Sequence, residues 1–213
     1  MATSSLALRF FFLSVIFGEI VHGCVITISN NCNYMVTACS QTGQENIDQW
    51  DLSAGTSQAI DLGTACSWPS AVVYASVTGQ CAVTGTPYAA TDRNLANLAE
   101  FTIPGSGNQD FYDLSNVNAY TIPMSINAPT GCDSITCSIS DISSFCQPNN
   151  VLQTQPTGAL SCVNTDGTAG LGPTAGTRQF KAACPQAYSY NFDDATSTFT
   201  CPTGSDYEVV FCP

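Results

Sequence analysis

The sequence predicts an all-β fold: a flattened β-sandwich or barrel with a small disulfide-rich loop lobe beside it. Three observations predict it. Short runs of β-branched and aromatic residues alternate with Gly, Ser, Thr and Pro, and no stretch shows a sustained helical period with caps. Twelve cysteines can form six disulfides. A chain of 213 residues is long enough for one sizeable core with a small satellite.

The first strands follow from the run CVITISNNCNYMVTACS, which predicts two short strands around a turn at Asn30-Asn31. In such a hairpin Cys24 and Cys39 would face each other, and we expect them to form a disulfide. The remaining strands are predicted over Gln49–Leu52, Gln58–Leu62, Ala71–Thr78, Phe101–Ile103, Phe111–Leu114, Tyr120–Ile126 and the final buried run Val209–Phe211. A helical turn is predicted near Thr91–Leu98.

The composition changes at about residue 130. From 130 to 183 the chain is rich in Gly, Pro, Thr, Asn and Ser, so this segment can bury little apolar surface and depends on cross-links. We expect it to form the lobe, and 24–129 with 184–213 to form the core sandwich. The stretch 184–213 holds three cysteines, which predicts that it is tied to three distant parts of the chain.

The first 23 residues are typical of a secretory signal peptide. Arg9 precedes a short apolar run, residues 10–17, and the small residues Val21 and Gly23 lead to a cleavage site before Cys24. The run is too short for a membrane anchor. We therefore expect a secreted, monomeric domain over 24–213, without stable membrane insertion, in a compartment where the cysteines form disulfides instead of binding metal.

The charge of the chain excludes several functions. The formal net charge is −12, and Arg93, Arg178 and Lys181 are the only Lys or Arg residues after residue 23, which argues against nucleic acid or an anionic membrane as a partner. Neutral polysaccharides remain open as ligands. The only histidine, His22, lies in the predicted signal peptide, so a Ser-His-Asp or Cys-His mechanism is excluded. No cofactor is expected.

Three segments carry a family resemblance: ITISNNCNYMV, then LAEFTI followed by DFYDLSNVNAYTIPMSINAP, and finally CPQAYSYNFDDATSTFTCP followed by DYEVVFCP. In this order they resemble thaumatin-like proteins, the pathogenesis-related class that includes osmotin and zeamatin. The resemblance implies the fold above and the disulfides Cys32–Cys212, Cys66–Cys81, Cys132–Cys201 and Cys137–Cys184. Cys146–Cys162 is left to form the sixth bond, beside Cys24–Cys39.

Carboxylates are the remaining candidates for chemistry. Glu100 and Asp113 are expected on neighbouring strands, and paired carboxylates can hydrolyse glycosides, so these two are the catalytic candidates. The resemblance implies an acidic cleft of one arginine and four acids. Glu100, Asp113 and Asp194 match three of the acids, whereas the arginine position falls near Ala59 and the fourth acid on Asn118. The expected cleft is therefore altered at two positions.

Each candidate also has a plainer interpretation. Glu100 and Asp113 could be satisfied strand carboxylates. Asp193 and Asp194 would point to opposite faces of a strand, and we expect one to be a turn or cap residue and Asp194 to line the cleft. Four aromatic residues could stack on sugar rings, although such residues more often pack in a β core: Tyr88, Phe111, Tyr112 and Tyr120.

These expectations combine into a secreted, antifungal, defence-type protein that binds β-1,3-glucan or a fungal surface through the acidic cleft, with at most weak hydrolysis. One alternative is a true endo-β-1,3-glucanase, whose turnover would be lost in Glu100→Gln. Another is a non-catalytic interaction or inhibitor protein on the same scaffold.

Overall fold

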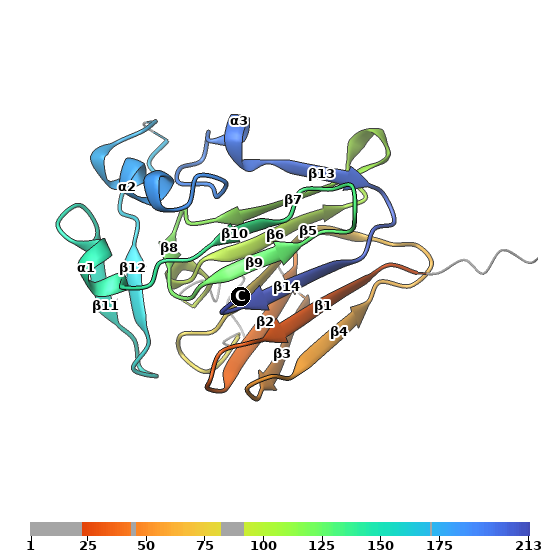
Figure 1. Cartoon of the computed structure of the whole chain (residues 1–213), viewed down its shortest axis with the longest axis horizontal. Coiled ribbons are helices and arrows are strands. Elements are labelled where there is room, and N and C mark those ends of the chain that lie inside the picture. The colour runs from red at the N-terminus through yellow and green to blue at the C-terminus, as the bar shows by residue number, and fades with distance from the viewer. Residues whose placement is uncertain (1–22, 44–45, 82–91, 171) are drawn as a thin grey trace, which may run out of the picture.

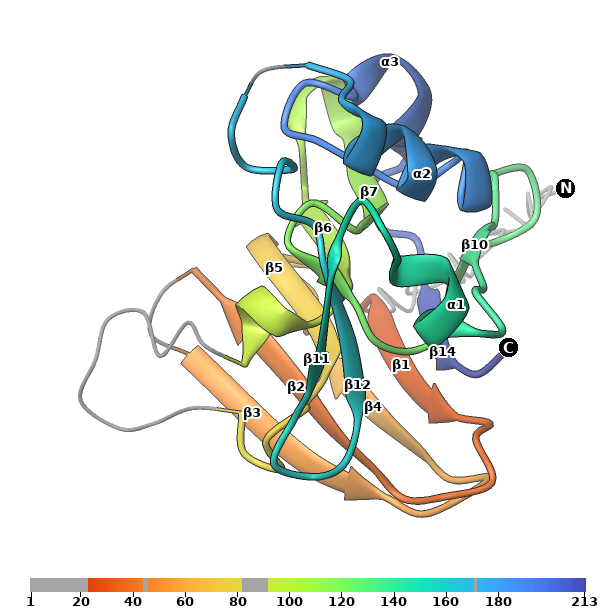
Figure 2. The ribbon, with the colours of Figure 1, turned by 90° about the vertical axis from the view of Figure 1, so that its left-hand side faces the viewer.

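The computed structural model describes residues 23–43, 46–81, 92–170 and 172–213. Two large sheets lie face to face, and a third, small sheet lies with two short helices at one end of them (Figure 1; Figure 2). This architecture confirms the predicted all-β sandwich with an adjoining lobe. The predicted signal peptide falls almost entirely outside the described residues.

The strands are arranged as follows. The five-stranded sheet has the order β10 (Ile135–Cys137), β9 (Met124–Asn127), β14 (Tyr207–Phe211), β1 (Val25–Asn30) and β4 (Ser57–Asp61). The six-stranded sheet has the order β13 (Phe199–Pro202), β7 (Gln109–Ser115), β6 (Leu98–Ile103), β5 (Trp68–Ala75), β2 (Val36–Thr42) and β3 (Asn46–Leu52). The small sheet contains β11 (Val151–Thr154), β12 (Leu160–Val163) and β8 (Ala119–Tyr120). The helices are α1 (Ile142–Cys146), α2 (Ala175–Ala183) and α3 (Asp194–Ser197), with the 3₁₀ turns η1 (Arg93–Leu95) and η2 (Ser106–Asn108).

The core lies between the two large sheets and follows the alternation of side chains along their strands. Ile28 of β1 is fully buried and lies opposite Val209 in the parallel β1–β14 pair. Phe101 of β6 packs edge-on against Tyr207 of β14, with ring centroids 5.5 Å apart. The predicted final strand is confirmed, and it occupies the middle of the five-stranded sheet.

The predicted hairpin at the start of the chain is wrong, because its two strands lie in different sheets. β1 pairs with β14 and β4, whereas β2 pairs with β3 and β5. The turn at Asn30-Asn31 therefore carries the chain from one sheet to the other. Its end is fixed by the N–H of Asn31, which donates to the carbonyl of Phe211 (2.9 Å).

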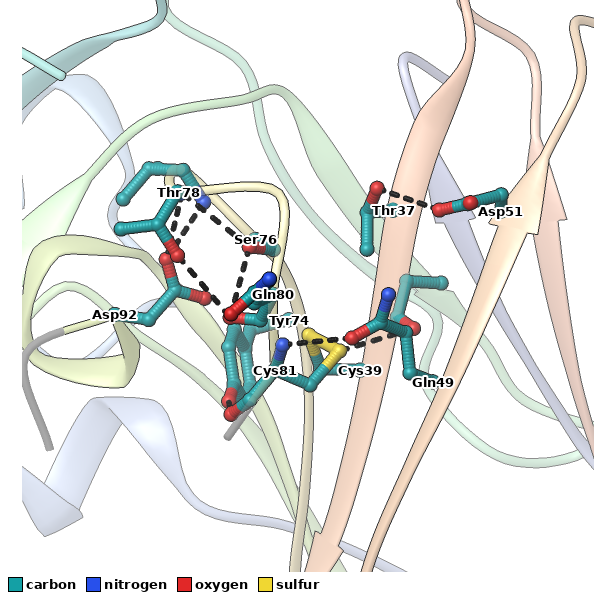
Figure 3. Close-up of a disulfide and its surroundings, with 12 residues drawn as sticks. Thr37, Cys39, Gln49, Asp51, Tyr74, Ser76, Thr78, Gln80, Cys81 and Asp92 are labelled. Carbon is teal, nitrogen blue, oxygen red and sulfur yellow. Dashed lines mark hydrogen bonds between the residues drawn. A yellow bond between two sulfur atoms is a disulfide. The ribbon is translucent and has the colours of Figure 1, made fainter. Parts of the chain in front are cut away.

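Two predicted disulfides are also wrong, Cys24–Cys39 from the hairpin and Cys66–Cys81 from the family resemblance. Cys24 bonds to Cys66 and Cys39 bonds to Cys81, both with a Cα–Cα distance of 5.4 Å, in place of Cys24–Cys39 and Cys66–Cys81. Cys24 directly precedes β1 and Cys66 follows β4, its antiparallel neighbour. Cys39 lies opposite Tyr74 in the β2–β5 pair, and the Tyr74 hydroxyl donates to the carbonyl of Cys81 (2.8 Å), as Figure 3 shows.

The other four disulfides join the predicted partners: Cys32–Cys212, Cys132–Cys201, Cys137–Cys184 and Cys146–Cys162. Three of them tie the stretch 184–213 to the loop after β1, to the loop before β10 and to β10 itself, as predicted. The C-terminal stretch thus contributes a strand to each large sheet, β13 and β14, and is cross-linked to three other parts of the chain.

The segment 130–183 contains more regular structure than its composition predicts. β10 joins the five-stranded sheet, and β11 with β12 forms a hairpin against β8. Helix α2 begins with a capping box, in which Thr174 and Thr177 each accept a hydrogen bond from the backbone N–H of the other. Phe180 of α2 is fully buried and packs edge-on against Phe145 (5.1 Å between ring centroids). With so few large apolar residues, the helix has no extended apolar period to predict it.

Two smaller features complete the fold. Pro123 divides the predicted strand Tyr120–Ile126 into β8 and β9, which belong to different sheets, because proline lacks the N–H that a continuous ladder needs. The helical turn predicted near Thr91–Leu98 is present as η1. Among the helices described, none is both long and apolar enough to cross a membrane.

Candidate functional site: an acidic pocket on the six-stranded sheet

A pocket of about 390 Å³ opens on the face of the six-stranded sheet that lies away from the sandwich core. Strands β5, β6 and β7 form its floor, and the segment 188–194 forms a wall. The core residues Phe101 and Tyr112 alternate with Glu100 and Asp113 along β6 and β7. The pleat therefore places both carboxyl groups on the pocket side of the sheet.

Glu100 and Asp113 lie directly opposite each other in the β6–β7 pair. Residues in such positions have Cβ atoms roughly 4.5–5.5 Å apart, so the two carboxyl groups are close neighbours on one surface. The Glu100 side chain is 33% exposed, while the Oδ1 atom of Asp113 is buried without a hydrogen-bond partner among the described residues. Two negative charges in this place repel each other, and one proton relieves that repulsion.

The surroundings of the pair separate the pKa values of its members. Burial raises the pKa of Glu100, but the charge of Arg93 and hydrogen bonds with Ser115 and Asp113 act in the opposite direction. Burial also raises the pKa of Asp113, and the charges of Glu100 and Asp194 raise it further, well above its ordinary range. We therefore expect the proton of the pair to reside on Asp113 and the charge on Glu100.

Arg93 supplies the cation of the pocket, although the sequence analysis did not assign it there. Its guanidinium lies 4.0 Å from Oε1 of Glu100. The turn η1 that carries it is held in place by the preceding residue, Asp92, which accepts hydrogen bonds from the N–H groups of Val77 and Thr78 (both 2.9 Å). Figure 3 shows Asp92 beside Thr78. The only available signal was the scarcity of cations, since three remain after residue 23.

Asp194 reaches the pocket from the segment 188–194. It is the first residue of α3, and its Oδ1 accepts a hydrogen bond from the Tyr188 hydroxyl (2.7 Å). Asp193 is the N-cap residue of α3, and its carboxylate bonds to Ser189 and Lys181 behind the wall. The adjacent acids thus have different surroundings, with Asp194 in the pocket and Asp193 at the cap.

The structure does not bring the other two predicted positions to the pocket. Ala59 lies in β4 of the opposite sheet, paired with Thr27. Asn118 is half-buried in the loop after β7, where its carbonyl accepts the N–H of Asn164 (2.9 Å); its neighbour Val117 lines the pocket instead. The expected arginine position and fourth acid position are therefore not part of this site.

The aromatic candidates also differ in whether they reach the pocket. Tyr112 and Tyr120 are fully buried, Phe111 lines the pocket, and Tyr88 falls outside the described residues. Phe192, which was not among the predicted candidates, is 67% exposed and lies between the pocket residues Asn191 and Asp194 in the sequence. Its ring does not line the pocket, but it is exposed to solvent close in sequence to two residues that do, so it is available to a ligand that extends beyond the pocket.

The arrangement can bind a neutral, hydroxyl-rich ligand. Glu100 and Asp194 accept hydrogen bonds, while Arg93 and a protonated Asp113 donate them. Within the described part of the chain, no group of three or more His, Cys, Asp or Glu side chains is arranged to hold a metal ion.

Comparison with known proteins gives a consistent result. The model of the Thaumatin family matches residues 30–213. The chain is 39% identical to pathogenesis-related thaumatin-like protein 3.6 of Cryptomeria japonica, over 87% of this chain and 81% of that protein. It is 35% identical to pathogenesis-related thaumatin-like protein 3.7 of the same species, over 87% of both chains, and 34% identical to pathogenesis-related protein 5 of Arabidopsis thaliana, over 88% of this chain and 89% of that one.

Proposed function

The chain belongs to the thaumatin family, and on that premise we propose that it is a secreted, monomeric, antifungal protein that binds β-1,3-glucan of cell walls in the acidic pocket. The observation that carries the proposal is the gathering of Glu100, Asp113 and Asp194 with one arginine in a single open pocket. Two further facts support a defence role outside the cell: the relatives are named as pathogenesis-related proteins, and the fold contains six disulfides.

The polarity of the pocket favours a neutral polysaccharide as the ligand. A single guanidinium lies among three carboxyl groups, which disfavours phosphate or another anion. Sugar hydroxyls both donate and accept hydrogen bonds, so they can satisfy Glu100 and Asp194 as acceptors and Arg93 as a donor. The exposed ring of Phe192 offers a flat apolar surface for the face of a pyranose ring.

The placement of the acids favours binding over efficient hydrolysis. Glycoside hydrolysis needs two carboxyl groups on either side of the scissile bond. Glu100 and Asp113 are instead cross-strand neighbours on one surface, where they act as a single proton-sharing pair. Any weak hydrolysis would use Asp194, from the wall formed by the segment 188–194, together with Glu100 or Asp113 from the floor.

The test is a pull-down of the disulfide-intact protein on insoluble β-1,3-glucan, with cellulose and xylan in parallel and the supernatant assayed for released sugar. The variants are Glu100→Gln, Asp113→Asn and Asp194→Asn. Asp48→Asn is the matched control, because Asp48 is an exposed acid of β3 that does not line the pocket. We expect Glu100→Gln and Asp194→Asn to lower binding about tenfold, which corresponds to about 1.4 kcal/mol.

The outcomes separate the alternatives. Equal retention of all four variants would rule out the acidic pocket as the glucan site. Sugar release that is abolished in Glu100→Gln would identify the protein as a glucanase. Absence of glucan binding, together with inhibition of a secreted glycosidase by the wild-type protein, would favour the interaction or inhibitor function.

A further inference from the structure

A second pocket, of about 570 Å³, lies where the loop after β1 meets the ends of β2, β3 and β5 and the tip of the β11–β12 hairpin. We call it the Tyr34–Met35 pocket, after the two residues at its edge. Its other walls include Thr37, Asp51 and Thr157, and it shares no lining residue with the acidic pocket. Its volume is within the range of sites that bind small organic ligands.

Tyr34 and Met35 are unusually exposed apolar side chains held on a rigid loop. They are 55% and 61% exposed, and they are two of the four large hydrophobic residues exposed in the described part of the chain. The loop is fixed at both ends: the Asn30 side chain donates to the carbonyl of Tyr34 (2.8 Å), and Cys32 is bonded to Cys212. Their exposure is thus built into the fold, as in a preformed binding surface.

The remaining walls are equally fixed, and their hydroxyl groups already donate internally. The Thr157 hydroxyl donates to the carbonyl of Val77 (2.7 Å), and the Thr121 hydroxyl donates to the side chain of Asn97 (3.0 Å). The Ser76 hydroxyl donates to the carbonyl of Gln80. These groups offer few donors to a ligand, so a ligand that needs to accept hydrogen bonds fits the pocket poorly.

Asp51 is the exception. Its Oδ1 accepts a hydrogen bond from the Thr37 hydroxyl across the β2–β3 pair (2.7 Å), and no described residue donates to Oδ2. Both ion pairs among the described residues lie elsewhere, at Glu100 and Asp193. The pocket therefore combines an aromatic ring, a thioether and apolar walls with one negative charge that no cation of the described chain compensates.

We propose that the Tyr34–Met35 pocket binds an apolar ring compound that carries a protonated amine. The ring packs against Tyr34 and Met35, and the ammonium group donates to the free oxygen of Asp51. Methionine and tyrosine both make favourable contacts with aromatic rings, and tyrosine also attracts a cation over its face. The formal net charge of −12 favours the approach of a cation to any part of this protein.

The test uses three ligands of one shape and different charge: phenethylamine, phenethyl alcohol and phenylacetate. Each is titrated into the ¹⁵N-labelled, disulfide-intact protein at pH 7, and amide shifts are followed in two-dimensional spectra. We expect saturable shifts around residues 34–37 and 51 with the amine, roughly threefold to tenfold weaker binding of the alcohol, and no binding of the anion.

Variants connect the binding to the pocket. Asp51→Asn keeps the shape of the side chain and should weaken amine binding threefold to tenfold, to the level of the alcohol. Tyr34→Ala removes an exposed ring, so it should fold normally and weaken binding of the amine and the alcohol alike. The matched controls are Asp48→Asn, an exposed acid on the same strand as Asp51, and Glu100→Gln in the acidic pocket. Neither control should change amine binding.

Three results would overturn the proposal: no saturable shifts with the amine, shifts confined to residues around Glu100, or equal affinity for the amine and the alcohol. Glucan binding serves as an independent readout, because Asp51→Asn and Tyr34→Ala leave the acidic pocket intact. Failure of the glucan proposal would therefore not imply failure of this one, and the reverse also holds.

Discussion

Lys181 and Asp193 form an ion pair, Nζ to Oδ2 3.1 Å, behind the wall that carries Asp194. The Lys181 ammonium also donates to the Ser197 hydroxyl (2.8 Å), and Oδ2 of Asp193 accepts from both the N–H and the hydroxyl of Ser189 (3.0 and 2.9 Å). One partly buried network thus joins α2 to both ends of the segment that lines the acidic pocket. We therefore expect the position of that wall to depend on Lys181, although Lys181 does not line the pocket.

Lys181→Met tests this dependence. The substitution keeps the apolar stem but leaves the carboxylate of Asp193 without its cation, and the side chain of Asp193 is only 10% exposed. We expect the free energy of unfolding to fall by about 2 kcal/mol, because an unpaired charge remains buried, and glucan binding to weaken. Chemical denaturation and the glucan pull-down measure the two effects.

A matched control and a second variant make the result specific. Arg178→Met alters a cation on the same helix whose side chain donates to an exposed carbonyl, and it should change stability little. Asp193→Asn added to Lys181→Met should recover part of the loss, because the pair then no longer contains an uncompensated charge. Additive losses in the double variant would contradict a coupled pair.

Asp113 should make the stability of the protein dependent on pH. Its folded-state pKa is raised by burial and by the neighbouring charges of Glu100 and Asp194. Folding is therefore supported while Asp113 is protonated, and this support is lost as the pH rises from the ordinary carboxyl pKa through the raised one. Asp113→Asn removes that loss, so we expect a higher Tm than wild type at pH 7 and little difference at pH 3.

Calorimetry across this pH range measures the effect, with Asp48→Asn as the control for loss of one charge from an exposed acid of the same molecule. A stabilisation of Asp113→Asn that is the same at pH 3 and pH 7 would show that packing, and not ionisation, is responsible. The comparison also tests whether the pocket gives up stability for function, as binding sites with buried charges often do.

The strands were predictable from the sequence where the signal is local, and the pairing was not. Val209–Phe211 is predicted as a buried strand from its own residues, and the three cysteines of the stretch 184–213 predict that this stretch is tied to distant parts of the chain. The turn at Asn30-Asn31 also looks local, but it separates two sheets, so pairing adjacent strands gave the wrong disulfide Cys24–Cys39. The bond Cys66–Cys81, which the family resemblance implied, is wrong because each of these cysteines has one of the other two as its partner. Helix α2 has Phe180 as its one large buried apolar side chain, too little to produce a helical period.

The candidate site was likewise predictable only in part. Glu100 and Asp113 were predicted together because they lie in neighbouring strands of one sheet, and the C-terminal stretch 184–213 brings Asp194 to them. Arg93 could not be placed, because it lies in a short 3₁₀ turn whose position is set by contacts of Asp92 with a distant loop. The exposure of Phe192 likewise depends on how the segment 188–194 folds over the sheet.

The disulfide pairing gives a direct prediction. Proteolysis under non-reducing conditions, followed by mass spectrometry, should yield peptides that link Cys24 to Cys66 and Cys39 to Cys81. Each bond closes a loop with a sequence separation of 42 residues, for which the loop-entropy relation gives a stabilisation of about 4 kcal/mol. Cys39→Ala/Cys81→Ala should lose up to about that amount in chemical denaturation. A peptide linking Cys66 to Cys81 would contradict the structure.

Phe192 provides a sharp test of the proposed polysaccharide binding. If its exposed ring packs on the face of a sugar, Phe192→Ala should weaken glucan binding by up to about tenfold, as expected when one aromatic stacking contact is lost, and leave the free energy of unfolding almost unchanged. Val151→Ala is the matched control, because Val151 is exposed on β11 and lines neither pocket. Binding isotherms on insoluble glucan give both affinities. Equal affinities for the two variants would show that the ring takes no part, and binding would then depend on the carboxyl groups and Arg93 alone.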